Sequence, residues 1–200
     1  MRCAASSRFL PLVLPPSPVA LVRQAARHIC LQVLWSAYLQ AWATGIRFHT
    51  LQVRYHMFSR KEIEAEIAPW CRAHGVGILA HSVLGKGLLT GKYKRGHVFS
   101  EDDERSGFFD FQGERFNQYC DAVEKLSAIA TRKGHTMTEL AVGWVLREPA
   151  VSVALVGAKS EAQVLANCKH VESFTEEELA EIEAILEAAP HLNWTITNGG

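Results

Sequence analysis

The stretch Val151–Asn167 reads VSVALVGAKSEAQVLAN and decides the fold class expected for this chain of 200 residues. Its β-branched residues Val151, Val153 and Val156 predict a short buried strand. Gly157 breaks that strand before a helical segment begins. A strand that passes through a glycine turn into a helix is a building unit of α/β proteins, so the stretch favours an α/β fold.

The start of that helix has features of an anion site. Ser160 followed by Gln163 forms the sequence pattern of a capping box. The unpaired amides and the dipole of a helix N-terminus favour phosphate, and Lys159 adds a positive charge at the same place. The same residues fit an ordinary strand-to-helix turn with a surface lysine equally well, so the stretch alone leaves both interpretations open.

Composition excludes several classes of function. The formal net charge is +0 and 48% of the residues are hydrophobic, which is typical of a soluble globular protein and gives no support for a nucleic-acid partner. The five cysteines are scattered and never spaced as CxxC, which argues for a reducing compartment and against a disulfide scaffold. The nine histidines do not stand at metal-ligand spacing. We therefore expect a cytoplasmic protein without a metal site.

Residues 1–46 differ from the rest of the chain, because they contain almost no acidic residues and include the proline-rich patch LPLVLPPSPVA. The prolines count against a signal helix, and Arg23, Arg27 and His28 exclude an uninterrupted membrane span. Three interpretations remain: a targeting segment, a poorly ordered tail, or sequence from a wrong start or shifted frame. The last two are favoured, because Leu31–Trp42 follows no clean helical or strand period. We expect residues 1–46 to be poorly ordered or aberrant.

The chain from residue 47 alternates expected strands and helices. Strands are expected at 49–55, 76–81 and 151–156, and helices at 59–74, 116–133, 136–148, 160–167 and 175–186. The second strand should be buried on both faces, and Ser100–Gly113 should form a loop over a site. This order requires parallel strands with right-handed crossovers. Because three strands leave edges unpaired, self-association through those edges is expected.

Four ordered segments, LQVRYHMFSR, HSVLGKGLLTGKY, LAVGWVLREPAV and LVGAKSEAQVLAN, resemble the C-terminal half of an aldo-keto reductase. The resemblance covers roughly Leu51–Leu186 and is to the branch shared by bacterial reductases and potassium-channel beta subunits. It implies a (β/α)8 TIM barrel with its active site at the C-terminal ends of the strands. The three strands would be the last three β/α units, so 47–190 would be a partial barrel and 191–200 a tail.

The resemblance also implies a nicotinamide end and a pyrophosphate loop of an NADP(H) site. Gln52 corresponds to the glutamine that holds the nicotinamide carboxamide. Ser82 and Leu84, with the backbone of Gly85–Gly87, match the loop that wraps the pyrophosphate. His81 stands where the family usually has a larger aromatic residue stacked on the nicotinamide. A strand-end histidine bonded to a neighbour is an equally good interpretation of His81.

The remaining cofactor residues come from the same resemblance. Lys92 and Arg105 fall where the family places cations on the cofactor. The adenosine end is matched by Gly157, Lys159, Gln163 and Asn167, with Lys159 facing the 2′-phosphate. A cation beside a helix N-terminus would favour NADPH over NADH, because the extra phosphate requires charge and donors.

The resemblance implies no catalytic residue in this chain. The family's aspartate, tyrosine, lysine and histidine belong to the first half of the barrel, and the four tyrosines here stand outside the matching motif. We therefore expect a truncated NADPH-dependent aldo-keto reductase, inactive alone, whose complete fold would reduce a small carbonyl substrate. Two alternatives stay open: an NADP(H)-binding pseudoenzyme or partner subunit, and a non-functional product of a frameshifted gene.

Overall fold

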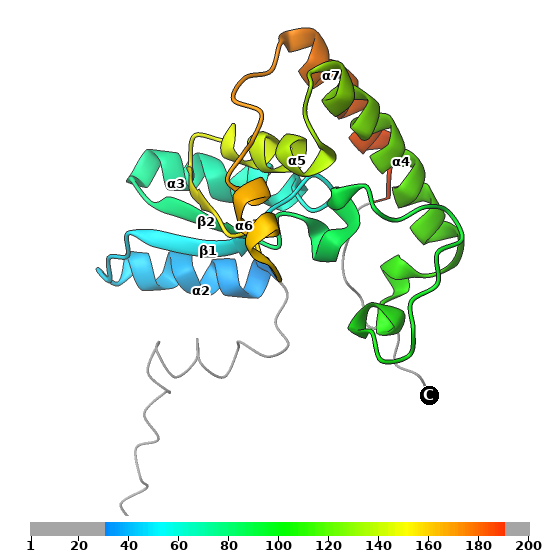
Figure 1. Cartoon of the computed structure of the whole chain (residues 1–200). Coiled ribbons are helices and arrows are strands. Elements are labelled where there is room, and N and C mark those ends of the chain that lie inside the picture. Colours follow the sequence, from blue (N-terminus) through cyan, green and yellow to red (C-terminus); the bar gives the residue numbers. More distant parts are fainter. Residues whose placement is uncertain (1–30, 191–200) are drawn as a thin grey trace, which may run out of the picture. The chain divides into compact units, whose positions relative to one another are not determined.

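The structure, a computed structural model, describes residues 31–190, with side chains from Trp35 onward (Figure 1). The proline-rich patch and the expected tail at 191–200 lie outside the described residues. Two compact units divide the chain, Met1–Phe48 and His49–Gly200, and each is considered by itself.

The first unit contains a helix where none was expected. Helix α2 spans Leu31–Ala43, and Phe48 packs edge-on against Tyr38 and Trp42, with ring centroids 5.2 and 5.3 Å apart. The expectation that this segment forms no folded element is wrong. Its few polar residues, Gln32, Ser36 and Gln40, recur at a helical spacing of four, and the segment includes neither glycine nor proline, so the sequence carries a helical signal that was overlooked among the apolar residues.

The second unit is built on a three-stranded parallel sheet in the order β1-β2-β3. The strands are β1 (Thr50–Arg54), β2 (Gly77–His81) and β3 (Val151–Ala154). Gln52 of β1 is in register with Leu79 of β2, which is in register with Val153 of β3. The expected parallel α/β arrangement is confirmed for the described part of the chain.

The two faces of this sheet differ in burial. One face is closed by the side chains of Leu51, Val53, Ile78 and Ala80, which are all buried. On the other face Gln52 is exposed and Leu79 half-buried. The expectation that β2 is buried on both faces is therefore wrong. So is the expectation of a buried third strand, because β3 is an edge strand whose Val153 remains 41% exposed, and Val156 lies beyond its end.

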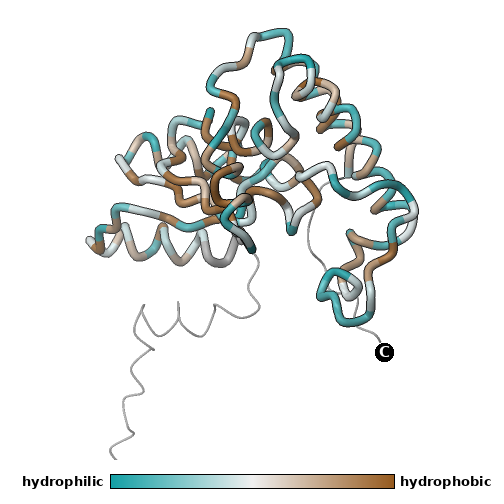
Figure 2. The backbone as a smooth tube through the Cα atoms, viewed as in Figure 1, coloured by the Kyte–Doolittle hydropathy of each residue, from teal (hydrophilic) through white to brown (hydrophobic). Residues whose placement is uncertain are grey.

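Helices connect the strands and cover the buried face. A π-helical turn η1 (Ile63–Ile67) continues into α3 (Ala68–His74), which ends at Gly75 in a left-handed conformation. The other helices are α4 (Gly113–Arg132), α5 (Met137–Leu146), α6 (Glu161–Asn167) and α7 (Glu176–Ala188). Figure 2 shows hydrophobic stretches gathered on the strands and α5, where Trp144 is only 1% exposed.

Most of the expected helix starts are confirmed. Thr136 and Thr175 form complete capping boxes with Glu139 and Glu178, respectively. The expected inward face of α4 is also buried, with Tyr119, Val123, Leu126 and Ala130. Ser59 differs, because its hydroxyl accepts a hydrogen bond from Arg54 Nε at 3.1 Å across the β1 end instead of capping a helix.

Candidate functional site

The carboxyl ends of β1 and β2 bring three of the expected site residues together. Gln52 lies exposed on β1, two residues before Arg54, which is in register with His81 at the end of β2. Alternate residues of a strand share a face, so the side chains of Gln52, Arg54 and His81 lie on the same side of the sheet. Ser82 comes directly after His81, with its Oγ 2.9 Å from Nδ1 of that residue.

His81 is therefore a half-buried imidazole that contacts its neighbour, as one of the two interpretations of this residue requires. Burial, and secondarily the charge of Arg54, lower the pKa of His81 below its usual value. The ring is thus held neutral at neutral pH, which leaves its face available for stacking and one nitrogen for the contact with Ser82.

The loop after β2 takes an unusual backbone path. Ser82 and Lys86 have φ angles of 59° and 53°, and Gly87 has a φ of 89°. Leu84 caps the 3-10 turn η2 (Gly85–Thr90), and Thr90 Oγ1 donates a hydrogen bond to the carbonyl of Gly87 at 2.7 Å. Left-handed residues beside right-handed ones make backbone concavities of the kind that bind anions.

Two cations converge on this turn. A Cβ added at Gly87 would lie 3.6 Å from Nη1 of Arg105 and 3.7 Å from Nζ of Lys92. Lys92 is exposed and its ammonium lies 4.7 Å from the centroid of the Tyr93 ring. Three residues expected to contact one cofactor, Gly87, Lys92 and the more distant Arg105, thus meet at one point.

Arg105 is held by a residue that sequence reasoning missed. Its Nε donates to Oδ1 of Asp103 at 2.7 Å, and its Nη2 donates to Oδ2. Its Nη1 donates to the carbonyl of Lys86 at 3.2 Å and to the hydroxyl of Tyr93. The hydrogen bonds from Arg105 hold the pKa of Asp103 well below its usual range. The only sequence signal was an aspartate two residues before Arg105 in a run of charges.

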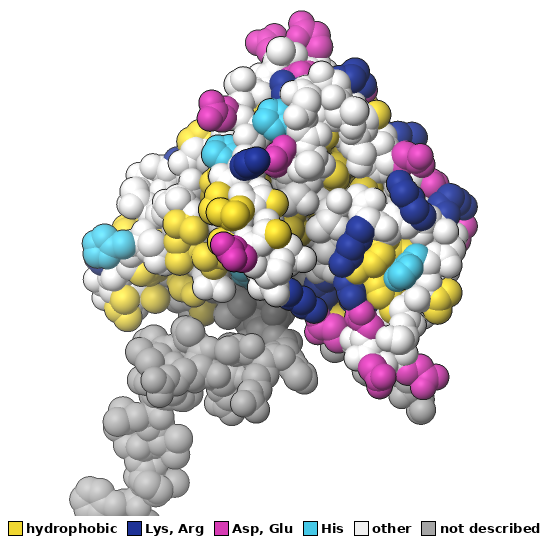
Figure 3. Space-filling model, in the orientation of Figure 1, with side chains coloured by type: hydrophobic (Ala, Val, Ile, Leu, Met, Phe, Trp, Pro, Cys, Tyr) yellow, Lys and Arg dark blue, Asp and Glu magenta, His cyan; other side chains and the backbone are white. Residues whose placement is uncertain are grey.

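The excursion at 100–113 carries this pair. It contains two short 3-10 turns, η3 (Glu104–Gly107) and η4 (Phe109–Phe111), and a second tie to the preceding turn in the ion pair Lys86–Glu104 at 2.6 Å. Basic and acidic side chains lie next to each other along this edge of the molecule (Figure 3). The expected loop over a site is therefore fastened to the Gly87 turn by one ion pair, Lys86–Glu104, and by the hydrogen bond from Arg105 to the carbonyl of Lys86.

The expected adenosine end forms its own small cluster. Gln163 Oε1 accepts from the backbone N–H of Lys159 at 2.7 Å, and Asn167 Nδ2 donates to the carbonyl of Gly157 at 3.3 Å. The capping bond from Gln163 N–H to Ser160 Oγ is present at 3.3 Å. Because α6 has only seven residues, its dipole is small, and the exposed ammonium of Lys159 is the main charge here.

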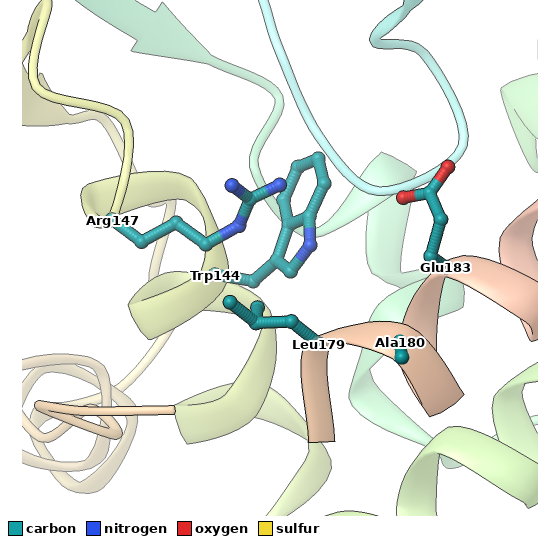
Figure 4. A pocket seen from close by; sticks show the side chains of 5 residues that line it. All are labelled: Trp144, Arg147, Leu179, Ala180 and Glu183. Carbon is teal, nitrogen blue, oxygen red and sulfur yellow. The ribbon is translucent and has the colours of Figure 1, made fainter. Parts of the chain in front are cut away.

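A separate pocket of about 290 Å³ lies away from these residues, between α5 and α7. It is lined by Trp144, Arg147, Leu179, Ala180 and Glu183. Figure 4 shows Arg147 lying along the indole of Trp144, with its guanidinium carbon 4.4 Å from the ring centroid. None of the expected cofactor residues lines this pocket.

Two other kinds of site are absent from the described residues. No three histidine, cysteine or acidic side chains in the stretch 31–190 are grouped to hold a metal ion. Within the same stretch, no helix has the length and apolarity needed to cross a membrane.

Comparison with known proteins decides the family. The sequence model of the Aldo/keto reductase family matches residues 28–187. The chain belongs to the aldo/keto reductase family. Proteins of this family are oxidoreductases that typically bind a nicotinamide cofactor. The match begins well before Leu51, so the expectation that family-like sequence starts near that residue is wrong, and the region of α2 is included.

Individual relatives agree with this assignment. The chain is 38% identical over 117 residues to the aldo-keto reductase YhdN of Bacillus subtilis, covering 58% of this chain and 35% of that protein. It is 32% identical over 170 residues to a probable voltage-gated potassium channel subunit beta of Arabidopsis thaliana, covering 78% of this chain and 51% of the relative.

A solved structure gives the same result for the fold. The glycerol dehydrogenase AKR11B4 from Gluconobacter oxydans superposes with a TM-score of 0.68 at 32% identity, covering 81% of this chain and 49% of that one. The chain thus spans about half the length of this structure and of the plant relative.

Proposed function

We propose that this chain carries the NADP(H)-binding portion of a carbonyl-reducing aldo-keto reductase. The observation that supports this most strongly is the convergence of Lys92 and Arg105 on Gly87. A glycine in a left-handed turn lets a ligand approach the backbone closely, and two cations beside it complement a pyrophosphate.

The individual roles come from position. Gln52 would hold the nicotinamide carboxamide and His81 would lie against the nicotinamide ring, since His81 ends β2 and Gln52 lies on the same face of the adjacent strand β1, two residues before its end. Ser82 and Leu84 begin the turn that would wrap the pyrophosphate. These assignments put the reactive end of the cofactor on the open face of the sheet.

The adenosine end would be bound by Gly157, Lys159, Gln163 and Asn167. The hydrogen bonds of Gln163 and Asn167 fix the turn that presents Lys159. An ammonium at this position would bind NADPH more tightly than NADH, because it pairs with the negative 2′-phosphate that NADPH has and NADH lacks. The cofactor of this chain is therefore NADP(H) in this proposal.

Binding, rather than reduction, is the activity we assign to the described residues. In this proposal the three strands are the last three of a (β/α)8 barrel, and a small carbonyl would be reduced only in the complete fold. The tyrosine hydroxyls of the second unit are engaged in structural bonds: Tyr55 with Glu64 at 2.9 Å, Tyr119 with Asp110 at 3.1 Å, and Tyr93 with Arg105. Burial also raises the pKa of Tyr55 and of Tyr119, which makes both hydroxyls weaker acids than a free tyrosine.

A second candidate function is an NADP(H)-binding partner subunit. The similarity to the Arabidopsis potassium channel subunit beta, over most of this chain, favours it. So do the exposed apolar side chains of β3 and α6, among them Val164 and Leu165 at 51% and 62%. Figure 3 shows hydrophobic side chains on the surface over α6. For either function we propose a cytoplasmic location, in keeping with the free thiols of Cys71, Cys120 and Cys168.

Two measurements on the purified full chain test the proposal. Equilibrium titration should detect NADPH binding, and substitution Lys92→Ala should weaken it by roughly tenfold because one phosphate contact is lost. The matched control is Lys94→Ala, which removes an exposed ammonium two residues away and should change little. NADPH oxidation with aromatic aldehydes should be undetectable; appreciable turnover would contradict the assignment to binding alone.

A further inference from the structure

Asp103 holds one edge of the Arg105 guanidinium. Its Oδ1 accepts from Nε at 2.7 Å, and its Oδ2 accepts from Nη2. Oδ1 also accepts from the backbone N–H of Arg105 at 3.0 Å, a bond that caps the 3-10 turn η3. Two parallel bonds between a carboxylate and a guanidinium fix the direction in which the guanidinium points as well as its position.

The other end of the same guanidinium faces the Gly87 turn. Nη1 donates to the carbonyl of Lys86 at 3.2 Å and would lie 3.6 Å from a Cβ added at Gly87. With the bond from Nη1 to the hydroxyl of Tyr93, the partners in the described part of the chain use four of the five N–H groups of Arg105. The fifth belongs to Nη2 and lies on the edge shared with Nη1. A phosphate at the turn would meet this N–H and the charge of the guanidinium.

The face of the guanidinium is packed as well. Its central carbon lies 4.7 Å from the centroid of the Phe99 ring. The side chains of Arg105 and Asp103 are only 20% and 23% exposed. A free arginine side chain has many rotamers and loses that freedom when a ligand orders it. The contacts within the chain order Arg105 before any cofactor arrives.

We propose that Asp103 is a positioning residue, which holds Arg105 so that the open end of its guanidinium faces the pyrophosphate turn at Gly87. The inference deepens the proposed function and rests on it, because it takes Arg105 as a cofactor contact. The pyrophosphate is common to NADPH and NADH, so Asp103 supports the binding of both cofactors to the same extent.

The negative charge of Asp103 has the opposite effect on a bound phosphate, which it repels. The substitution Asp103→Asn tells the two effects apart. Asparagine keeps an oxygen that caps η3, but its amide nitrogen cannot accept the bond from Nη2. Binding becomes tighter if repulsion dominates and weaker if positioning dominates. We expect weaker binding at 0.15 M salt, where repulsion is screened over about 8 Å and the orientation of Arg105 is unaffected.

The experiment measures Kd for NADPH and for NADH on the full chain at that salt concentration. We expect Asp103→Asn to raise both Kd values by roughly three- to tenfold, because the cofactor must then order the arginine side chain itself. Asp103→Ser also keeps a capping oxygen and should have the same effect, which covers the case of a poorly folded first variant. The matched control is Asp102→Asn, which removes a charge from an exposed neighbour and should change neither Kd.

A second comparison tests whether Asp103 acts through Arg105. In the background of Arg105→Met, Asp103→Asn should change each Kd by less than about twofold, because two residues that act through one contact are not additive. NMR of the Arg105 Nε–H distinguishes positioning from a general loosening of the loop. Its signal should change in the Asp103 variants and persist in Glu104→Gln, which removes only the ion pair of the loop with Lys86.

The outcomes separate this inference from the function beneath it. A wild-type chain that binds NADPH, with Asp103 variants that bind both cofactors as tightly as wild type or more tightly, overturns the positioning role and leaves the proposed function standing. So does a loss confined to one cofactor, or a loss that persists in Arg105→Met. A wild-type chain that binds neither cofactor overturns both. Circular dichroism of each variant shows which Asp103 substitution gives the valid comparison.

Discussion

Arg54, the last residue of β1, lies in register with His81, the last residue of β2. Both side chains project from the open face of the sheet on which Gln52 is exposed. The charge of Arg54 adds to burial in lowering the pKa of His81. A basic residue beside the imidazole therefore keeps a neutral ring at the place assigned to the nicotinamide.

The pH dependence of stability should report this neutral histidine. A histidine whose pKa is lower in the folded than in the unfolded chain stabilises the fold above the unfolded value of 6.5, and this contribution is lost as the pH falls. The free energy of unfolding should therefore drop between pH 7 and pH 5, and the drop should be smaller in His81→Phe. Urea unfolding at each pH measures this. His97→Phe, at an exposed position, is the control, and equal slopes for all three proteins would contradict the account.

Removing the neighbouring charge should shift the same pKa. In Arg54→Met the part of the shift due to Arg54 disappears and the part due to burial remains, so the pKa of His81 should rise without reaching its usual value. NMR titration of the imidazole protons measures this directly. An unchanged pKa would mean that the two side chains do not face each other.

Gly143 of α5 should not tolerate a side chain. A Cβ there would lie 2.2 Å from the carbonyl oxygen of Val171 and 2.9 Å from its nitrogen, both backbone atoms. Helix propensity alone would favour alanine by roughly 1 kcal/mol. We expect Gly143→Ala to lower the free energy of unfolding by about 2 kcal/mol instead, because packed backbone must move. Denaturant unfolding of both proteins measures whether the free energy of unfolding falls or rises in Gly143→Ala.

The control for that substitution is Gly107→Ala. An added Cβ there meets nothing within 4 Å and its φ is not in the left-handed region, so little change is expected. Stabilisation by Gly143→Ala would show that α5 and the segment around Val171 do not approach as closely as described.

Replacing Arg60 should lower the free energy of unfolding more than replacing its exposed neighbour Lys61. Its guanidinium is 8% exposed and bonds Glu64 at 2.6 Å and Glu187 at 2.8 Å, joining the start of the β1–β2 crossover to α7. Arg60→Met would remove the largely buried cation that these carboxylates share, although Glu64 keeps Tyr55 and Glu187 keeps Lys61, at a cost of about 1–3 kcal/mol after allowing for their partial exposure. Lys61→Met, which removes an exposed partner of Glu187, should cost under about 0.5 kcal/mol. Equal decreases in melting temperature for Arg60→Met and Lys61→Met would contradict the account that the buried position of Arg60 makes its ion pairs stronger.

Local patterns explain what the sequence predicted correctly. The capping boxes of Thr136 and Thr175 depend on residues three apart, and the inward face of α4 depends on a helical period, so both are written in short stretches. The parallel order of the strands followed from the alternation of strands and helices along the chain. These features need no knowledge of distant contacts.

What the sequence did not predict depends on non-local contacts or on ambiguous composition. Whether Val153 is buried depends on which elements flank β3, and an edge strand reads like a central one. Helix α2 carries its helical signal only in three polar residues spaced four apart, which are easily overlooked in a largely apolar segment. Asp103 stood in a charged run that is typical of any solvated loop, and its bond to Arg105 depends on the path of the excursion. The convergence at Gly87 became evident only from that path.

Equilibrium titration of the full chain with NADPH, followed through the emission of its five tryptophans, tests the central claim most directly. The account predicts saturable quenching, tighter binding of NADPH than of NADH, and a loss of affinity in Lys92→Ala that is absent from Lys94→Ala. Quenching that fails to saturate at millimolar cofactor, or that is identical in the two lysine variants, would contradict it.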